Sequence, residues 1–368
     1  MDRRKLIRHT GIGAAAAAVL ATPALAQTAT AMPELKWRLT SSFPKSLDTI
    51  YGAAEFFAKR VAALTQDRFQ IRVFAAGEIV PGLQALDSVQ NATVECCHTA
   101  AYYYVGKDPT FAFDTAVPFG LNTRQHNAWV YQGGGLELMR EFYKDYSVTS
   151  FLMSHTGAQM GGWYRKEIKT PDDLKGLKMR IGGFAGQVLS KLGVVPQQIA
   201  GGDIYPALEK GTIDAAEWVG PYDDQKLGFN KVAPNYYYPG WWEGGAALSL
   251  YINQKAYDAL PEFYKQVIQS ATAETLDWSV AKYDAQNPKA LRELVAGGTK
   301  LQPFPAPVLE ACFNAAVQLY NETSATNPRF KKVYDQWSAF RREQVLWFRV
   351  AENTFDSFMA RQSAQNKL

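Results

Sequence analysis

Two short segments of this 368-residue chain hold the residue types from which an anion-binding site is built. In the first, Arg180 lies near the end of a predicted strand and precedes Gly182 and Gly183, which let backbone approach a ligand closely. A helix is predicted to start near Ala185. An arginine beside a helix N-terminus suits a carboxylate, because its planar fork binds both oxygen atoms. The alternative for Arg180 is a surface arginine in a salt bridge.

The second segment ends in Glu217 and Trp218. A short helix over 204–210 is predicted to end at Gly211, and a strand over 213–217 delivers this pair at its far end. Ligands of α/β folds bind in the loops that follow the strand ends. We therefore expect both segments to contribute to one binding site.

Motifs for covalent or metal-assisted catalysis are missing. The chain has no G-x-S-x-G elbow and no phosphate-binding loop with Lys and Ser/Thr. The histidines at 98, 126 and 155 share no metal-ligand spacing and the three cysteines form no C-x-x-C pair. We predict that the protein is not an enzyme.

Alternating strand and helix patterns must position these segments. Strands are predicted at 35–39, 69–74, 93–98, 148–154, 161–165, 177–181, 213–217 and 246–252, with helices between them and long helices at 256–285, 306–320 and 327–359. Three glycines at 133–135 are interpreted as a helix break. Two α/β units followed by helices are typical of an α/β fold with helices on the faces of its sheets.

The N-terminus predicts export. A basic run that contains Arg3 and Arg4 precedes an apolar stretch over 11–25, and small residues lead up to Gln27. The apolar part is too short to span a bilayer. Residues 1–26 are therefore predicted to be a signal peptide, of the twin-arginine type by its paired arginines, with an ordinary export signal as the alternative.

Charge and cysteine content narrow the class further. The formal net charge is only +4, and four of the basic residues lie in the predicted leader, so no electrostatic case exists for a nucleic-acid partner. Cys96, Cys97 and Cys312 are interpreted as buried small hydrophobic residues, with a disulfide from Cys312 to one of the pair as the alternative.

The two segments also carry a resemblance. "DLKGLKMRIGG" around Arg180 and "YPALEKGTIDAAEW" ending at Trp218 are similar to the solute-binding proteins of tripartite ATP-independent periplasmic (TRAP) transporters. The resemblance runs from about Leu35 to about Phe358. Dicarboxylate- and sialate-binding members usually have Asn where this chain has Trp218. The branch of the family that binds 2-oxo acids is a better match. The chain resembles it in having Trp218 at this position, Gln159 in "GAQMGGWYRK", and "YPGWWEGG" at 238–245.

This resemblance implies a role for each of six residues. Arg180 would hold the ligand carboxylate, and Gln159 would contact both the ligand and a cation. Glu217 and the main-chain carbonyl of Trp218 would bind that cation, sodium in this branch, and Trp218 would also wall the pocket. Glu243 would reach the far side of the ligand. Tyr103, in an aromatic run that core packing explains equally well, is a further candidate.

Charge balance also supports a bound cation, independently of the family resemblance. Arg180 neutralises a monoanionic ligand, whereas Glu217 in the same closed cleft would repel that ligand by roughly 4 kcal/mol at 4 Å in an intermediate dielectric. A cation between them removes the repulsion. Oxygen ligands suit a hard ion, either sodium or calcium. The alternative is a Glu217 that is protonated or paired with an arginine and binds no metal.

The resemblance implies an α/β, two-lobed periplasmic binding protein of the type II-like class with long C-terminal helices. The first lobe is predicted to hold 34–155 and about 253–330, and the second lobe 156–252. The helix at 327–360 is a dimerisation element in this reading, and core packing is the alternative.

We therefore expect a periplasmic subunit that binds a pyruvate-like 2-oxo monocarboxylate with sodium and delivers it to the membrane permease of a TRAP system. One alternative is a 2-hydroxy acid such as lactate, bound with calcium. A second is a secreted enzyme that uses Glu217 and Glu243 as an acid/base pair. A third is a sensory adapter with the same ligand.

Overall fold

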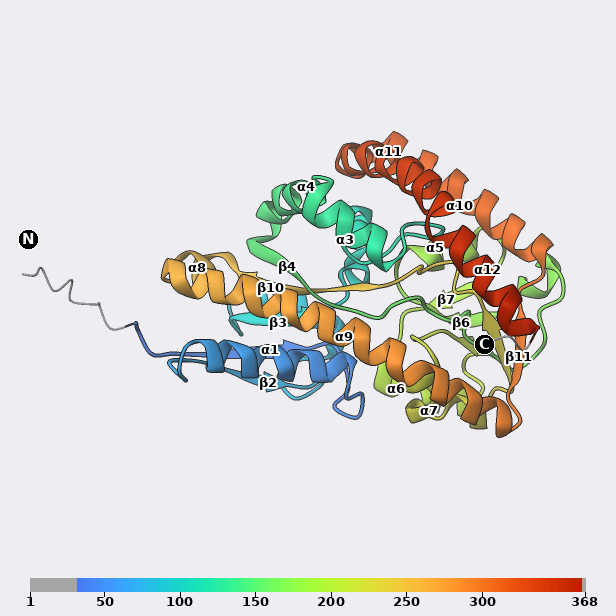
Figure 1. Cartoon of the computed structure of the whole chain (residues 1–368), viewed down its shortest axis with the longest axis horizontal. Helices are drawn as coiled ribbons and strands as arrows, with labels where there is room; N and C mark the ends of the chain where they lie inside the picture. The colour runs from blue at the N-terminus through green and yellow to red at the C-terminus, as the bar shows by residue number, and fades with distance from the viewer. Residues whose placement is uncertain (1–31, 366–368) are drawn as a thin grey trace, which may run out of the picture. The chain divides into compact units, whose positions relative to one another are not determined.

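Two mixed β-sheets form the frame of the structure, a computed structural model that describes residues 32–365 (Figure 1). The predicted signal peptide at 1–26 lies outside the described residues. We call each sheet with the helices packed on it a lobe. The two-lobed α/β class expected from the sequence is confirmed.

The first sheet has long, buried strands. They are β1 (Leu35–Ser41), β2 (Phe69–Phe74), β3 (Cys96–Thr99), β4 (Val148–His155) and β10 (Ala247–Asn253), in the order β2-β1-β3-β10-β4. Strand β1 is parallel to β2 and β3, whereas β10 is antiparallel to β3 and β4. Every residue of β4 and β10 is buried, including the polar residues Thr149, Ser150, Ser154 and His155 of β4. Helices α1 (Ile50–Leu64), α2 (Ala85–Gln90), α3 (Thr123–Gln132), α4 (Gly135–Tyr143) and α8 (Gln254–Asp258) belong to this lobe.

The second sheet has strands of only two to four residues. They are β5 (Trp163–Tyr164), β6 (Lys178–Arg180), β7 (Val195–Gln197), β8 (Ala215–Ala216), β9 (Asn235–Tyr238) and β11 (Lys300–Pro303), in the order β11-β9-β5-β8-β6-β7. Helices α5 (Gly183–Ser190), α6 (Gly201–Glu209) and α7 (Pro221–Leu227) follow β6, β7 and β8. Such short strands place loop residues close together at the sheet's edge.

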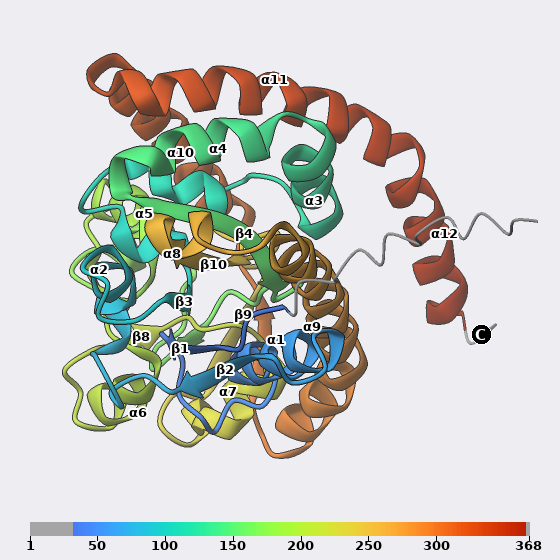
Figure 2. The same cartoon turned by 90° about the vertical axis from the view of Figure 1, so that its left-hand side faces the viewer.

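Helix α9 (Glu262–Ala296) runs along both lobes (Figures 1 and 2). It packs on α1 and β4 of the first lobe and on α7 of the second. The hydroxyl of Ser279 accepts the N–H of His155 in β4, and one helical turn later the Tyr283 hydroxyl donates to Asp223 of α7. The change from one lobe to the other therefore falls between Ser279 and Tyr283.

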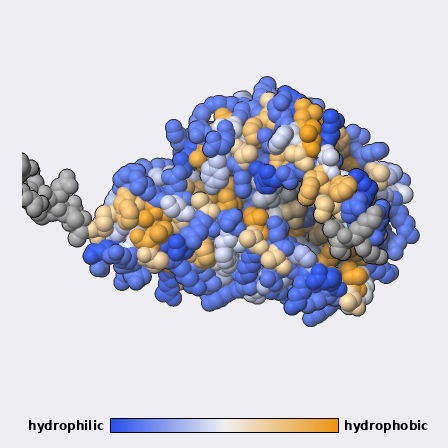
Figure 3. All heavy atoms as spheres, viewed as in Figure 1, coloured by the Kyte–Doolittle hydropathy of each residue, from blue (hydrophilic) through white to orange (hydrophobic). Residues whose placement is uncertain are grey.

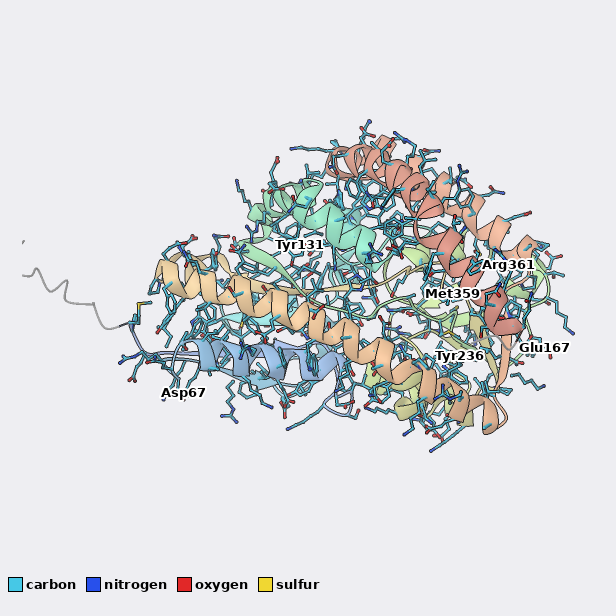
Figure 4. The ribbon with its side chains drawn as sticks, viewed as in Figure 1. Asp67, Tyr131, Glu167, Tyr236, Met359 and Arg361 are labelled. Atoms are coloured by element: carbon cyan, nitrogen blue, oxygen red, sulfur yellow. The ribbon has the colours of Figure 1, made fainter. Side chains whose placement is uncertain are left out.

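Three more helices complete the chain: α10 (Ala306–Thr326), α11 (Pro328–Val350) and α12 (Glu352–Ala364). Helix α10 packs on α5, and α11 packs on α3 and α4. No side chain of α12 is buried, and Met359 and Arg361 mark this helix in Figure 4. In Figure 3 apolar residues are interspersed among hydrophilic ones on the face where α11 and α12 lie. Among residues 32–365, no helix is both long and apolar enough to cross a membrane.

Several predicted elements differ from the observed ones. The helix predicted at 327–359 is two helices, α11 and α12, that meet at Ala351. The strand predicted at 246–252 within the second series is β10 of the first sheet, and β11 lies in the second sheet. The break at 133–135 is present, with Gly134 at a φ of 82°. Cys96, Cys97 and Cys312 are free and buried, as the first of the two interpretations expected.

Candidate ligand-binding site

Arg180 is the centre of a buried polar site. It ends β6 and is only 1% exposed. Its Nε donates to the carbonyl of Ile199 at 3.1 Å, and its Nη1 donates to the main-chain carbonyl of Glu217 at 2.7 Å and forms an ion pair with the Glu217 carboxylate. Its Nη2 has no hydrogen-bond partner. One nitrogen of the guanidinium group is therefore free to donate to an acceptor from outside the protein.

Glu217 follows β8 and is completely buried. Its Oε1 accepts from Arg180 and from the N–H of Gly182 at 2.9 Å, whereas Oε2 has no partner. Burial raises the pKa of this carboxyl group, and Arg180 and the Gly182 N–H act against that rise. The alternative in which Glu217 is paired with an arginine is therefore correct for Oε1, whereas Oε2 has no hydrogen-bond partner.

Trp218 places its indole ring over the guanidinium of Arg180, with 5.0 Å between Cζ and the ring centroid. The start of α6 packs tightly against this ring, because a Cβ on Gly201 would come within 2.4 Å of it. Phe43, from the segment after β1, meets the same ring at a centroid distance of 6.4 Å. Trp218 is therefore held between the two lobes.

Gln159 lies in the segment that joins β4 to β5, and Glu243 in the segment that joins β9 to β10; each segment passes from one sheet to the other. The Gln159 side chain donates from Nε2 to Thr156 Oγ1 at 3.2 Å, and its Oε1 has no partner. Its backbone N–H donates to the carbonyl of Glu243 at 3.3 Å. Oε2 of Glu243 is also unpartnered. Burial raises the pKa of Glu243 far above its ordinary value, Glu217 adds to the rise, and Arg180 opposes it.

A small cavity with a volume of about 10 Å³ lies beside these groups. It is lined by both lobes and by the segments that pass between the sheets: Phe43, Ile50, Ala100, Tyr102, Tyr103, Thr156, Gln159, Trp218, Val219, Ala246 and Leu248. The carbonyl of Tyr103 accepts from Gln198 Nε2 of the second lobe at 2.8 Å. Burial raises the pKa of the Tyr103 hydroxyl to about 12, and the nearby positive charge of Arg180 opposes that rise. The six residues singled out from the sequence therefore lie around one site.

Three further residues belong to this site and were not predicted from the sequence. Tyr102 packs on the Gly182–Gly183 turn, since a Cβ at either glycine would come within 2.6 Å of its ring. Burial raises the pKa of its hydroxyl far above the ordinary value, and the nearby charge of Glu243 adds to the rise. Thr156 holds Gln159, and Gln198 crosses to Tyr103. Tyr102 carried a signal, its place in the aromatic run at 102–104, which core packing also explained. Nothing near Thr156 or Gln198 in the sequence marks them.

The donor set fits a hard cation. Gln159 Oε1, Glu217 Oε2 and Glu243 Oε2 are buried oxygen atoms without hydrogen-bond partners, and alkali and alkaline-earth ions prefer oxygen ligands. Within the described part of the chain, no group of three or more His, Cys, Asp or Glu residues could hold a metal. A cation here would depend on amide and carbonyl oxygens as well as on carboxylates.

This fold and this buried site define a solute-binding protein whose ligand is enclosed between two lobes. Comparison with known families agrees: residues 40–327 match the bacterial extracellular solute-binding protein family 7, also called DctP. The chain belongs to this family. Its likeness to TRAP solute-binding proteins, its location outside the cytoplasm and its non-enzymatic class are thereby confirmed.

Three relatives are informative. The monocarboxylate 2-oxoacid-binding periplasmic protein of Nostoc sp. is 50% identical over 97% of this chain and 99% of its own length. A TRAP solute-binding protein from Bordetella bronchiseptica shares 54% identity and a TM-score of 0.90 over 91% of this chain and 99% of its own. It was solved as a mixed-occupancy dimer with calcium and picolinate in one site. One from Pseudoalteromonas atlantica, with bound sodium and pyruvate, shares 38% identity and a TM-score of 0.85, over 88% and 99%.

Proposed function

We propose that this protein binds a 2-oxo monocarboxylate, with pyruvate as the reference ligand, together with a cation, and delivers it to the permease of a TRAP transporter. One observation carries the proposal. A free guanidinium nitrogen of Arg180 and the unpartnered oxygens of Glu217 and Gln159 lie in one buried site. An arginine is always charged, so its free nitrogen is suited to an anionic acceptor such as a carboxylate. The unpartnered oxygen atoms of Glu217 and Gln159 are suited to a cation.

Sodium is the proposed cation, and calcium is the alternative. The Pseudoalteromonas relative holds sodium with pyruvate, and the Bordetella relative holds calcium with picolinate. One oxygen of Glu217 is already paired with Arg180, so little negative charge remains to bind the ion. A low ligand charge favours the monovalent ion.

Binding in this proposal requires the lobes to open and close. Arg180, Glu217 and Glu243 are all at most 3% exposed, so a solute cannot reach them in the present arrangement. Phe43 against Trp218, and Gln198 with Tyr103, are contacts that form only when the lobes meet. A solute that bridges Arg180 and the opposite wall stabilises the closed state by its higher affinity for it. The lobe boundaries expected from the sequence, 34–155 with about 253–330 and 156–252, differ from the sheets in two places, because β10 belongs to the first sheet and β11 to the second.

A homodimer through the C-terminal helices is part of the proposal. The run named in the sequence divides in two: Val333 and Trp337 are buried in the core, whereas Val345, Val350 and Phe355 are each more than half exposed. Leu346, Trp347 and Phe358 are exposed beside them. Such an apolar stretch is typical of an interface, and the Bordetella relative crystallised as a dimer.

Isothermal titration calorimetry tests the ligand. Pyruvate and longer 2-oxo acids are titrated in sodium, choline or calcium chloride, with succinate and lactate as comparison ligands. We expect binding of 2-oxo acids that depends on sodium, and no binding of succinate. Binding of succinate but not of pyruvate would overturn the proposal. Tight lactate binding in calcium would favour the 2-hydroxy acid alternative, and NMR detection of turnover would favour the enzyme.

A further inference from the structure

A polar cluster at the surface joins the segment after β1 to helices α7 and α9. Asp48 of this segment forms an ion pair with Lys226 of α7, and it accepts from the Tyr222 hydroxyl of the same helix at 3.1 Å. Lys282 of α9 donates to the Asp48 carboxylate at 3.0 Å and to its main-chain carbonyl at 2.7 Å. We call these four residues the Asp48 cluster. It ties a first-lobe loop to a second-lobe helix.

The segment that Asp48 anchors also walls the cavity. Phe43 and Ile50, on either side of it, line the cavity, and Phe43 meets Trp218. Thr49, next to Asp48, is completely buried and is the N-cap residue of α1. A displacement of Asp48 would therefore also move Ile50, two residues away in the chain, which lines the cavity.

The two lysines are already ordered by their own helices. Lys226 Nζ lies 3.8 Å from the centroid of the Tyr222 ring, and Lys282 Nζ lies 4.9 Å from that of Trp278. Their side chains are 29% and 24% exposed, against 50% for Asp48. Isolated surface ion pairs contribute little because they order two free side chains. Here several contacts share one carboxylate, and less freedom is lost when they form.

Asp48 is ionised in this environment. Burial opposes its ionisation, but hydrogen bonds and charge interactions with Lys226 and Lys282 outweigh it and lower its pKa to about 2. The carboxylate therefore keeps its charge throughout the pH range in which a secreted protein works.

We propose that Asp48 is a positioning residue for solute binding, which holds the 43–50 segment against α7 and so slows release of the solute. The inference rests on the proposed function for its ligand. Lobe opening separates Asp48 from Lys226 and Tyr222, whereas the groups that touch the solute lie deeper. The retention time of the solute is then set partly at the rim of the cleft, by residues that never contact it.

Stopped-flow tryptophan fluorescence with pyruvate at fixed sodium, while choline chloride varies the ionic strength, tests this role. For Asp48→Asn we expect a dissociation rate about 3- to 10-fold faster, the range for losing a network of partly exposed charge pairs. Dissociation from the wild type should accelerate with salt, because salt screens exposed charges, and the variant should lose most of that dependence. Lys226→Glu should release faster still, because it places two carboxylates together. Asp48→Glu should restore part of the retention.

Asp87→Asn is the matched control. Asp87 forms an exposed ion pair with Lys107 at 2.6 Å, and both residues lie in the first lobe. It should release pyruvate at the wild-type rate. Equal rates and equal salt dependence for wild type and Asp48→Asn would overturn the role of Asp48.

Small-angle X-ray scattering of the solute-free proteins needs no ligand. Asp48→Asn should have the larger radius of gyration, and an unchanged radius would contradict the inference. If the wild type failed to bind pyruvate, the ligand assignment would fall while this scattering comparison would still decide on Asp48.

Discussion

Glu217 and Asp224 are two of the buried carboxylates that follow β8 in the second lobe, and they differ in how many hydrogen-bond donors the protein gives them. Asp224 of α7 accepts from the Trp163 indole at 3.0 Å, the Tyr236 hydroxyl at 2.7 Å and the Val219 N–H at 3.2 Å, so both of its oxygens have donors. Glu217 is equally buried, but one of its oxygens has none.

The two groups illustrate the difference between a structural carboxylate and one available to a ligand. Asp224 links β5, β9 and the chain after Trp218, and Tyr236 marks this region in Figure 4. Its environment is complete without any other molecule. An unpaired buried oxygen lowers stability, and under the proposed function the cation supplies the partner that Glu217 Oε2 lacks.

Arg180→Ala should cause the largest loss. It removes the free nitrogen to which the ligand carboxylate is assigned, and truncating one partner of a buried charge pair costs about 2–5 kcal/mol, so we expect pyruvate affinity to fall by about 100-fold or more in calorimetry. The control is Arg140→Ala, whose guanidinium lies over Phe151 in the first lobe. Unchanged affinity in a variant with wild-type circular dichroism would contradict the assignment.

Glu217→Gln tests the ligand side of the comparison. The amide keeps an acceptor but removes the negative charge that would bind the cation. We expect pyruvate affinity in sodium to fall by about tenfold, or roughly 1.4 kcal/mol, and to depend little on sodium. A sodium dependence equal to that of the wild type would argue against a cation at Glu217.

Asp224→Asn tests the structural side. Its amide nitrogen would face donors where an acceptor stood, so we expect the free energy of unfolding in urea to fall by about 1–3 kcal/mol. The sodium dependence of binding should stay that of the wild type. If Asp224→Asn changed this dependence and Glu217→Gln did not, the two roles would have to be exchanged.

The pH dependence of stability should carry the signature of Asp224. Burial raises its pKa to about 7, while hydrogen bonds from Tyr236 and Trp163 oppose the rise. Between about pH 4 and pH 7 the folded state keeps a proton that the unfolded state has released, so this group lowers stability as the pH rises. Urea unfolding at pH 4.5 and 7.5 should show a smaller decrease for Asp224→Asn than for the wild type. An equal decrease in both proteins would assign the effect to other groups.

Tyr103→Phe should have the smallest effect. The variant removes a hydroxyl that interacts electrostatically with Arg180 but keeps the ring that lines the cavity. A single polar contact contributes about 1 kcal/mol, so we expect affinity to fall by about 2- to 5-fold. Tyr131→Phe, in an exposed position on α3 (Figure 4), is the control. A loss as large as that for Arg180→Ala would place Tyr103 at the centre of recognition.

Much of the site could be predicted because its residues sit at strand ends with distinctive neighbours. Arg180 precedes two glycines and Glu217 precedes a tryptophan, and both strands were recognised. The first sheet was also predictable, since its strands have six or more residues apart from β3. The strands β7, β9 and β11 were missed, because three or four residues show no periodicity. The equally short β5, β6 and β8 were found because each lies within a longer predicted strand.

The sequence by itself determined the class of the fold, the family and the residues that bear charge in the site, because apolar periodicity and local motifs are written along the chain. Only the tertiary structure decided that β10 belongs to the first sheet, that Asp48 meets Lys226 and Lys282, and that Arg180 and Glu217 each keep one free atom. Pairing of strands and saturation of buried polar groups depend on contacts between residues far apart in the chain. Such contacts leave no local pattern.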